Sequence, residues 1–559
     1  MQKNKNFYIT TPIYYVNDKP HIGHFYCNLL TDTFIRFNKL FRHKTTILTG
    51  TDEHGQKIQR SAEKKNINPQ EFCDEYSNYF KQMSVDFDFL FAKNNFNNGQ
   101  NFIRTTDEKH KNFVQKTWLK LQQNGWIYKG SYSGWYAIRD EAFYDDNEIF
   151  EDNGVKKAIA TKAEVEWREE ESYFFKMSAF NQLLLDLYEE EKNLIIPNEK
   201  ANEITAILAG KNGGQLQDLS ISRMKKTDST GSEFHWGIAV PNDEKHVIYV
   251  WLDALFNYYS ANEQIWQTKQ GKITHFIGKE ILKFHAIYWP AFLIALNYDE
   301  NNLKNAKTEN IKPLIFDNIY THGWWTNEGE KISKSLGNIV DPYKEIEWLE
   351  SEFSLDKNTA IDYLKYFCIS SVPFGSDADY SRLALTNVVN SQIANNIGNL
   401  CQRVTSFLNK NFRTEIDKIN HENIANFINP EHQNFLTSIK QIDSKHADEV
   451  VENNLLSNAD FFTIIKLVNE KFFDCNKFLE TNEPWRKTKN NQKDEALSCL
   501  LAVLEVFVFY GKLLLPVIPH IAQKLLQNCG SDVQKANFTC NPSQIPEDLQ
   551  ICCPRLVIR

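Results

Sequence analysis

The sequence lacks any paired arrangement of cysteines, and it lacks a hydrophobic leader. Its ten cysteines are scattered through 559 residues without a single CxxC pair. The N-terminus, MQKNKNFYIT, carries two lysines with no apolar run behind them, which argues against a secretory signal. We therefore expect a reducing compartment, free thiols and a cytoplasmic location.

A long uninterrupted apolar run and a surplus of positive charge are missing as well. The longest apolar stretch, LLAVLEVFVFYGKLLLPVIPH, is broken by Glu505 and Lys512, so we expect a buried helix and no membrane span. The formal net charge is −9, and residues 381–559 are neutral, with 19 basic and 19 acidic side chains. A nucleic-acid partner would therefore need local positive patches.

Three kinds of pattern divide the chain. Residues 1–128 and 232–375 alternate strand-like runs such as NFYITTPIYYV with helix-like runs, which is typical of a parallel sheet with helices on both faces. Residues 129–231 hold short aromatic strands and read as an insertion between the two halves. Residues 376–559 are expected to form a separate helical bundle. Apolar residues there recur every three or four positions, at Val389, Ile393, Ile397, Leu400, Val404 and Leu408.

The stretch PHIGHFYCNLL places two histidines around a glycine, between a strand-like run and a helix-like run. Gly23 has no Cβ, so a ligand could approach the backbone closely there. The following helix would point its N-terminal N–H groups into the turn, where His21 and His24 could donate to phosphate oxygens. Taken alone, the same residues also fit a solvated loop with two ordinary histidines.

A second polar turn, EKISKSLGN, follows a strand-like run 307 positions later. Lys331 and Lys334 are three residues apart, and Ser333 lies between them. Ammonium and hydroxyl groups on such a loop suit a pyrophosphate leaving group, because phosphoryl chemistry needs positioning and charge stabilisation. A plain surface loop is the alternative, and the co-occurrence with the histidine turn favours the functional interpretation.

These motifs resemble the two signatures of class I aminoacyl-tRNA synthetases. The blocks TPIYYVNDKPHIGH, LTGTDEHG, YVWLDALFNYYS, FIGKEILKFHAIYWPAFL and HGWWTNEGEKISKSLGN resemble, in order, those of the methionyl-tRNA synthetases. The resemblance implies a Rossmann-like α/β catalytic domain with a connective insertion, followed by an α-helical anticodon-binding domain. It also implies a methionine–tRNA ligase that uses ATP with Mg²⁺, L-methionine and tRNA(Met), initiator and elongator.

The resemblance assigns residues to the amino-acid pocket. A methionine site needs apolar and aromatic walls for the thioether, and a carboxylate for the ammonium. Asp52 is the expected carboxylate, although it could equally be a turn residue in GTDEHG. The implied wall residues, for which core packing is the alternative, are Ile13, Tyr15, Trp251, Ala254, Leu255, Tyr258, Ile281, His285 and Trp289.

Two further sites follow from the resemblance. The ATP-binding set is His21, Gly23, His24, Gly278, Glu280, Trp325, Lys331, Ser333 and Lys334. Within it, His21, His24, Lys331 and Lys334 are the expected catalytic residues, and Trp325 is placed near the adenine. In the helical region, Asn399, Arg403 and Trp485 are the expected readers of the CAU anticodon, since an amide, a guanidinium and an indole can hydrogen-bond and stack unpaired bases.

The sequence departs from many relatives in its insertion. No cysteine lies between Cys73 and Cys368, and Ala137 stands where those relatives often have one. Structural zinc needs four nitrogen or sulfur ligands, so we expect none. The chain also lacks the appended C-terminal domain by which some relatives dimerise, so a monomer is expected. Another class I synthetase, a smaller nucleotidyltransferase and a non-catalytic tRNA-binding relative remain as alternatives.

Overall fold

The computed structural model describes residues 5–92, 96, 101–140, 142–144, 146–211, 215–225, 234–332, 337–440, 457–532 and 539–557. These residues form two compact units. The first unit comprises residues 1–20 and 43–322, and the second comprises residues 21–42 and 323–559. Each unit is described by itself.

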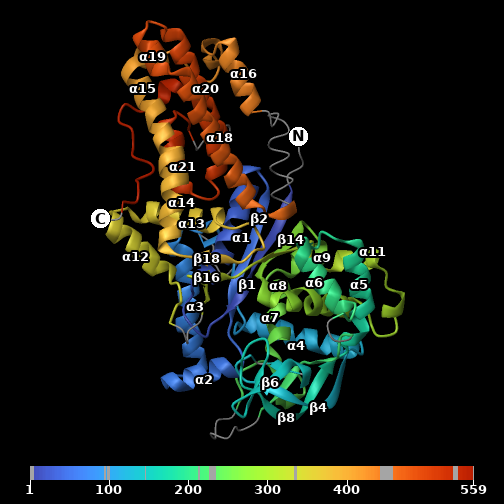
Figure 1. Cartoon of the computed structure of the whole chain (residues 1–559). Helices are drawn as coiled ribbons and strands as arrows, with labels where there is room; N and C mark the ends of the chain where they lie inside the picture. Colours follow the sequence, from blue (N-terminus) through green and yellow to red (C-terminus); the bar gives the residue numbers. More distant parts are fainter. Residues whose placement is uncertain are drawn as a thin grey trace. The chain divides into compact units, whose positions relative to one another are not determined.

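A parallel sheet is the centre of the first unit. Its six described strands lie in the order β3-β2-β1-β14-β15-β9, and every neighbouring pair is parallel. Figure 1 shows β1, β2 and β14 side by side. This is the parallel α/β core that the alternating pattern predicts. The strands are β1 (Asn6–Tyr15), β2 (Lys44–Asp52), β3 (Phe102–Arg104), β9 (Ile195–Ile196), β14 (Lys272–Gly278) and β15 (Asn318–His322).

Helices pack on this sheet through one continuous apolar core. Buried residues from β1, β14, α4 and α10 belong to it, and the largest include Trp118, Trp126 and Trp289. A parallel sheet that is covered on both faces needs such near-continuous apolar strands. The helices of the unit are α2 (Gln56–Lys65), α3 (Pro69–Asp86), α4 (Glu108–Gln123), α5 (Asn181–Glu190), α6 (Asn198–Leu208), α7 (Val250–Leu255), α8 (Asn257–Ser260), α9 (Glu263–Thr268), α10 (Trp289–Asn297) and α11 (Thr308–Ile311). Short 3₁₀ turns cover Leu90–Ala92, Asp146–Glu148, Met177–Phe180, Lys279–Ile281 (η5), Leu303–Asn305 and Lys312–Leu314, and a π-helical turn, η6, covers Phe284–Tyr288.

The inserted segment forms antiparallel sheets. One has the order β10-β8-β4-β5, another the order β11-β13-β12, and β6 pairs with β7. Strands β12 and β13 lie beyond residue 231, the expected end of the insertion, so the antiparallel pairing continues to Ile248. Ile195–Ile196 lie within the expected insertion, but they pair with β15 of the parallel sheet. The strands are β4 (Ile127–Ala137), β5 (Ala142–Tyr144), β6 (Ile149–Asp152), β7 (Val155–Ala158), β8 (Glu166–Phe175), β10 (Leu219–Ser220), β11 (Ser222–Met224), β12 (Ala239–Val240) and β13 (Asp243–Ile248).

The second unit is mainly helical. Figure 1 shows α15, α18, α20 and α21 as one bundle. A small sheet in the order β17-β16-β18 lies in the same unit. The elements are α1 (Ile22–Leu40), β16 (Trp325–Asn327), β17 (Glu330–Lys331), α12 (Pro342–Phe353), α13 (Lys357–Ser370), β18 (Ala378–Tyr380), α14 (Arg382–Val388), the π-helix η9 (Val389–Gly398), α15 (Asn399–Ile416), α16 (Pro430–Ile439), α18 (Phe461–Asn482), α19 (Pro484–Lys489), α20 (Lys493–Gly511) and α21 (Pro519–Asn528). Further 3₁₀ turns cover Ile424–Phe427, Lys512–Leu514 and Pro542–Gln544.

The bundle core follows the predicted periodicity. The six apolar residues that recur from Val389 to Leu408 are all buried. The first three are spaced by four, and the chain there is a π-helix, whose wider turn keeps residues four apart on one face. The apolar helix Lys493–Leu514 is long and apolar enough to span a membrane, but 83% of its most apolar window is buried inside the protein, as the prediction of a core helix requires.

The compact units do not coincide with the expected domain limits. The expected limits fall after residues 128, 231 and 375, whereas α1 groups with the chain that follows residue 322. The expected domain limits remain predictions.

Candidate active site

Asp52 and two wall residues are brought together by strand register. Tyr15 and Asp52 are Cα partners at the carboxyl ends of β1 and β2, and Ile13 is the partner of Gly50. A register shift between Thr10 and Ile13 precedes them, so the end of β1 departs from a regular ladder. The carboxyl ends of parallel strands are where ligands bind in such sheets.

The residue after Asp52 anchors the turn. Glu53 is fully buried, and its carboxylate accepts two hydrogen bonds from the Arg104 guanidinium at 2.7 and 2.9 Å. It also accepts hydrogen bonds from the hydroxyls of Thr51 at 2.7 Å and Thr106 at 2.5 Å. A bidentate, fully hydrogen-bonded pair of this kind fixes geometry. The Glu53 side chain therefore holds the turn that carries Asp52.

His54, the next residue, belongs to a hydrogen-bond network that connects the same turn to helices α4, α7 and α8. The Asp253 carboxylate on α7 accepts hydrogen bonds from His54 Nδ1 at 2.6 Å and His110 Nε2 at 2.7 Å. His110 Nδ1 lies 2.7 Å from the Ser260 hydroxyl. Burial opposes ionisation of Asp253, but the facing His54 and His110 outweigh burial and hold the pKa of Asp253 below its ordinary value.

Stacked aromatic rings form the proposed pocket wall. The Trp251 ring lies against Phe284 with a centroid distance of 3.7 Å and an interplanar angle of 4°. His285 lies at the edge of the same wall, with its ring centroid 6.4 Å from that of Trp251. The Tyr258 hydroxyl lies 2.7 Å from His285 Nε2, and His285 Nδ1 lies 3.0 Å from the Ile281 carbonyl. Since a carbonyl only accepts, the His285 proton is on Nδ1 and Tyr258 donates to Nε2.

A second histidine, His275, is hydrogen-bonded to Trp289 of the expected pocket wall. Trp289 Nε1 donates to His275 Nε2 at 3.3 Å, so His275 carries its proton on Nδ1 and donates to the Thr10 hydroxyl at 2.7 Å. Burial lowers the pKa of His285 to about 4, and burial together with His285 and Lys269 lowers the pKa of His275 well below its usual range. Both rings are therefore neutral at pH 7.

The other pocket candidates lie on the same elements. Ala254 and Leu255 belong to α7 and are buried, and Ile281 ends η5 and is half-buried. Leu255 and Trp289 are fully enclosed by the main core. All ten residues assigned to the methionine pocket fall within the first unit.

The histidine turn begins helix α1 in the second unit. Gly23 N–H donates to His21 Nδ1 at 3.0 Å, and His21 N–H donates to His24 Nδ1 at 3.1 Å, a reciprocal capping box made of imidazoles. Backbone N–H groups only donate, so both Nδ1 atoms accept and both neutral rings carry their proton on Nε2. Burial, reinforced by His21, lowers the pKa of His24 well below its usual range.

Gly23 has a steric reason within this turn. A Cβ at residue 23 would lie 2.9 Å from His21 Cε1 and 3.1 Å from His21 Nδ1. The space that glycine leaves open is occupied by the His21 ring. Gly278 is similar, because a Cβ there would lie 2.5 Å from both carboxylate oxygens of Glu280.

The remaining ATP candidates are described only in part. Trp325 is buried, and its ring packs edge-on against Tyr26 at 5.5 Å. Lys331 ends β17, where its backbone pairs with Thr326, and its side chain is outside the described structure. Ser333 and Lys334 lie outside the described residues.

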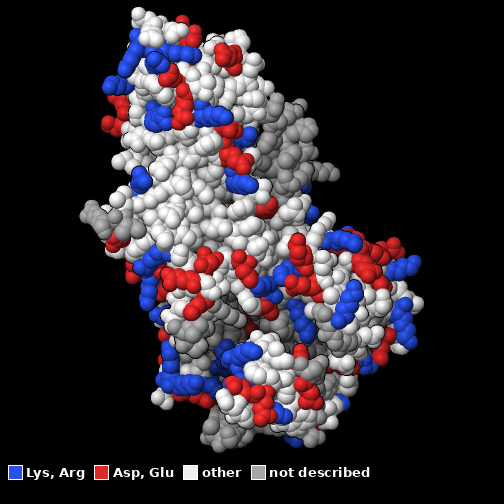
Figure 2. Space-filling view, in the orientation of Figure 1, with Lys and Arg blue, Asp and Glu red and all other residues white. Residues whose placement is uncertain are grey.

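The three anticodon candidates converge at one end of the bundle. The Arg403 guanidinium lies over the Trp485 ring at 5.2 Å, and Asn399 is one turn before Arg403 on α15. Figure 2 shows Lys and Arg side chains gathered near α19, whose last turn contains Arg486, Lys487 and Lys489. Two of these cations are paired, Arg486 with Glu483 at 3.0 Å and Lys487 with Glu495 at 3.1 Å, and a local positive patch for nucleic acid remains a prediction.

The hydrogen-bond network around the Asp52 turn leaves no local sign in the sequence. Its members are Glu53, His54, Arg104, His110 and Asp253, of which the first two lie in LTGTDEHG and the last in YVWLDALFNYYS. Among the residues that the structure describes, no group of three or more histidines, cysteines, aspartates or glutamates could hold a metal ion. The absence of structural zinc remains a prediction.

Comparisons with known proteins agree with one another. The family described as tRNA synthetases class I (M) matches residues 7–153 and 152–405. A methionine–tRNA ligase of Rickettsia conorii is 40% identical over 543 residues, covering 96% of this chain and 95% of that protein. One of Rickettsia bellii is 40% identical over 541 residues, covering 96% of this chain and 94% of its own. A crystal structure of Mycobacterium tuberculosis methionyl-tRNA synthetase bound by methionyl-adenylate matches with a TM-score of 0.81 and 30% identity, covering 98% of this chain and 100% of that chain.

Proposed function

The chain belongs to the class I methionyl-tRNA synthetases and is a methionine–tRNA ligase, and from this premise we propose how its residues divide the work. The reaction has two steps. Methionine and ATP first give methionyl-adenylate and pyrophosphate, and methionine then passes to the 3′-terminal adenosine of tRNA(Met). The observation that carries the assignment of residues is the aromatic wall beside the Asp52 turn.

Methionine lies with its thioether against the Trp251–Phe284 stack and with its ammonium at Asp52. Sulfur–aromatic contacts are favourable, and they need a ring whose position is fixed. The Tyr258–His285 and Trp289–His275 hydrogen bonds fix the rings behind this wall. Ile13, Tyr15, Ala254, Leu255 and Ile281 complete the pocket. Because His285 is neutral at pH 7, its ring carries no positive charge that would repel the ammonium.

ATP, supplied as its magnesium complex, is held by the histidine turn and the lysine loop. The methionine carboxylate attacks the α-phosphorus, an oxygen–phosphorus bond forms, and pyrophosphate leaves with the electron pair. His21 and His24 donate from Nε2 to phosphate oxygens, while Lys331, Ser333 and Lys334 stabilise the leaving group. Gly278 and Glu280 lie near the ribose, and Trp325 near the adenine. No enzyme nucleophile is needed, because holding the two substrates together supplies the main advantage.

The tRNA is recognised in the helical bundle by Asn399, Arg403 and Trp485. The anticodon CAU is unpaired, so its bases can stack on the indole and accept hydrogen bonds from the guanidinium. The 2′-hydroxyl of the terminal adenosine takes the acyl group, as in other class I enzymes. We place the protein in the cytoplasm, as a monomer without a membrane partner, acting on initiator and elongator tRNA.

The specificity is tested by amino-acid-dependent ATP–pyrophosphate exchange with each of the twenty amino acids. We expect exchange with methionine, and exchange with leucine or cysteine alone would contradict the assignment. Lys334→Ala should lower the exchange rate by at least tenfold while the KM for methionine stays within twofold of wild type. A matched loop change, Ser335→Ala, should leave the rate near wild type. An unchanged rate in Lys334→Ala would remove this lysine from the catalytic set.

A further inference from the structure

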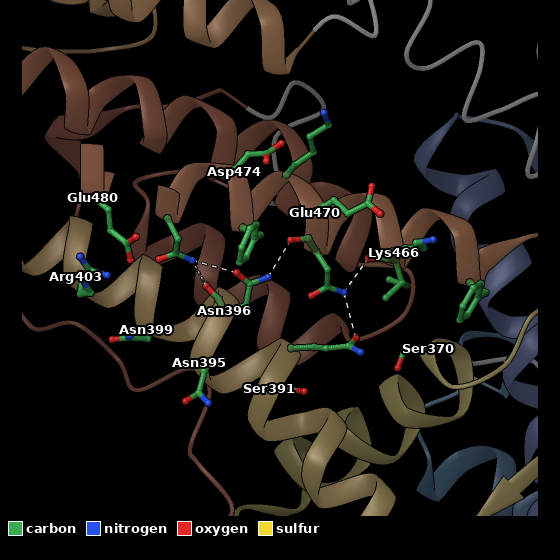
Figure 3. Close-up of a pocket in the computed structure, with 17 residues that line it drawn as sticks. Ser370, Ser391, Asn395, Asn396, Asn399, Arg403, Lys466, Glu470, Asp474 and Glu480 are labelled. Carbon is green, nitrogen blue, oxygen red and sulfur yellow. Dashed lines mark hydrogen bonds between the residues drawn. The ribbon is translucent and has the colours of Figure 1, made fainter. Parts of the chain in front are cut away.

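A polar groove runs along the bundle beyond the anticodon candidates. Its volume is about 950 Å³, and η9 with α15 form one wall while α18 forms the other. Asn399 and Arg403 lie at one end, and Ser370 and Lys466 lie at the other (Figure 3). The stretch of α18 that lines it, from Phe462 to Glu480, is about 27 Å long at 1.5 Å per residue. The groove therefore extends well past the contact area of three anticodon bases.

A ladder of amides joins the two walls beneath the groove. Asn476 Nδ2 donates to Asn396 Oδ1 at 3.1 Å, and Asn396 Nδ2 donates to the Asn469 carbonyl at 2.9 Å. Asn469 Nδ2 donates to the Tyr366 hydroxyl at 2.6 Å, and that hydroxyl lies 3.0 Å from Gln392 Oε1. This ladder fixes the spacing of the walls, so the groove is preformed.

Two oxygen atoms in the groove take no part in this ladder. Ser370 Oγ and Asn469 Oδ1 are buried, and neither has a hydrogen-bond partner among the described residues. A buried acceptor without a donor is unfavourable by about 1–3 kcal/mol. An occupant that brings hydroxyl or amino donors would satisfy the Asn469 amide oxygen, and the Ser370 hydroxyl can accept from it as well.

The charge of the groove excludes a simple phosphate track. Its lining contains three basic side chains, Arg403, Lys466 and Lys471, and as many acidic ones. The acidic side chains are Glu470, Asp474 and Glu480. Phosphate binding requires a clear positive excess. A balanced lining instead suits the neutral parts of an RNA strand, the ribose hydroxyls and the base edges.

An exposed aromatic ring adds a stacking surface. Phe473 lines the groove from α18, and 64% of its surface is accessible. Unpaired bases stack on such rings irrespective of sequence. An aromatic ring, donor-seeking oxygens and neutral charge occur together here, on a surface continuous with Asn399 and Arg403.

We propose that this groove binds the RNA strand adjoining the anticodon and recognises its ribose 2′-hydroxyls and base edges, with Ser370 and Asn469 as acceptors. The proposal rests on the proposed function, because it takes Asn399 and Arg403 as the start of the RNA path. The 2′-hydroxyl is the donor that distinguishes RNA from DNA at such a site. The groove thus adds discrimination of sugar to the discrimination of anticodon sequence.

The test uses the full chain and two hairpins with the stem and loop of the tRNA(Met) anticodon arm. One hairpin is all RNA, and the other keeps ribose in CAU but has 2′-deoxyribose in the flanking nucleotides. We expect wild type to bind the deoxy-flanked hairpin roughly fivefold more weakly. Ser370→Ala should bind the RNA hairpin with the same loss and should no longer distinguish the two. Because the Ser370 hydroxyl has no described partner to lose, this variant should fold normally.

Matched variants separate the outcomes. Ser391→Ala is the control, since the Ser391 hydroxyl at the rim already donates to the Asn387 carbonyl at 2.7 Å, and it should behave as wild type. Phe473→Ser should weaken both hairpins equally. Equal binding of the two hairpins by wild type would overturn the proposal, and so would a change in salt dependence in Lys466→Ala. If instead a hairpin with a different anticodon binds as well as CAU, the proposed function of Asn399 and Arg403 fails, and this result is independent of the sugar comparison.

Discussion

Replacing Asp253 by asparagine isolates the charge that ties the Asp52 turn to the helices. The carboxylate accepts one hydrogen bond from each of two imidazoles, His54 and His110. An amide of the same shape retains one accepting oxygen and offers an N–H in place of the other. One imidazole must then move its proton, and His110 can do so because Ser260 already faces its Nδ1.

The magnitude follows from the two bonds. A hydrogen bond to a charged group contributes about 1.5–3 kcal/mol, and a neutral one about 0.5–1.5 kcal/mol. Asp253→Asn keeps two neutral bonds in place of two charged ones, so the free energy of unfolding should fall by about 2–3 kcal/mol. Because the turn also carries Asp52, we expect the KM for methionine to rise roughly tenfold, which corresponds to about 1.4 kcal/mol.

Urea unfolding and ATP–pyrophosphate exchange measure the two effects separately. The matched control is Asp362→Asn in the helical unit. Asp362 is fully buried, accepts a hydrogen bond from the Ile521 N–H at 2.8 Å and faces His520 Nδ1 at 3.2 Å. This control should lower stability by a comparable amount and leave the KM for methionine unchanged. The KM for ATP should be unchanged in both variants.

Two results would refute the reasoning. If Asp253→Asn and Asp362→Asn lower stability alike and both leave the KM for methionine unchanged, the Asp253 network supports the fold and does not position the pocket. If Asp253→Asn leaves stability unchanged, the two imidazoles do not bond to an ionised carboxylate.

Three further predictions address other parts of the molecule. Gly23→Ala places a methyl group 2.9 Å from the His21 ring. We expect thermal unfolding to show a loss of about 1 kcal/mol of helix capping, and the exchange rate to fall at least tenfold. Wild-type values in both assays would contradict the assigned contact. The pKa of His285 is lowered to about 4, so below pH 6.5 the unfolded chain binds a proton that the folded chain does not, and stability should fall by about 3 kcal/mol between pH 6.5 and pH 4. Urea unfolding at several pH values should show this slope in wild type and a shallower one in His285→Asn; parallel slopes would assign it to other groups. Trp485→Ala should raise the KM for tRNA at least tenfold and leave exchange intact, whereas loss of exchange would make the indole a structural residue.

Local pattern was enough to predict the bundle core and the parallel sheet. The residues from Val389 to Leu408 repeat with a helical period, and burial follows that period because the bundle has one apolar face. The turn at His21 was also visible, since its cap lies within four residues of sequence.

Long-range pairing was not predictable in the same way. Asp253 meets His54 and His110 across 199 and 143 positions of sequence, and no local periodicity records such a meeting. At Gly23 the sequence suggested room for a ligand, and the structure adds a second constraint, because a Cβ at residue 23 would meet the ring of His21. Rotamers and register decide such contacts, and a single sequence does not contain them.

The reciprocal cap at the start of α1 has a consequence for the order in which the protein matures. Its two rings take their tautomer and direction from backbone groups at most three residues away, so the histidine pair forms as soon as the first turn of the helix forms, on a microsecond scale or faster. The methionine pocket joins residues from Ile13 to Trp289 and must wait for loop closures over hundreds of residues. The histidine cap is therefore a local structure, whereas the proposed methionine pocket depends on long-range contacts.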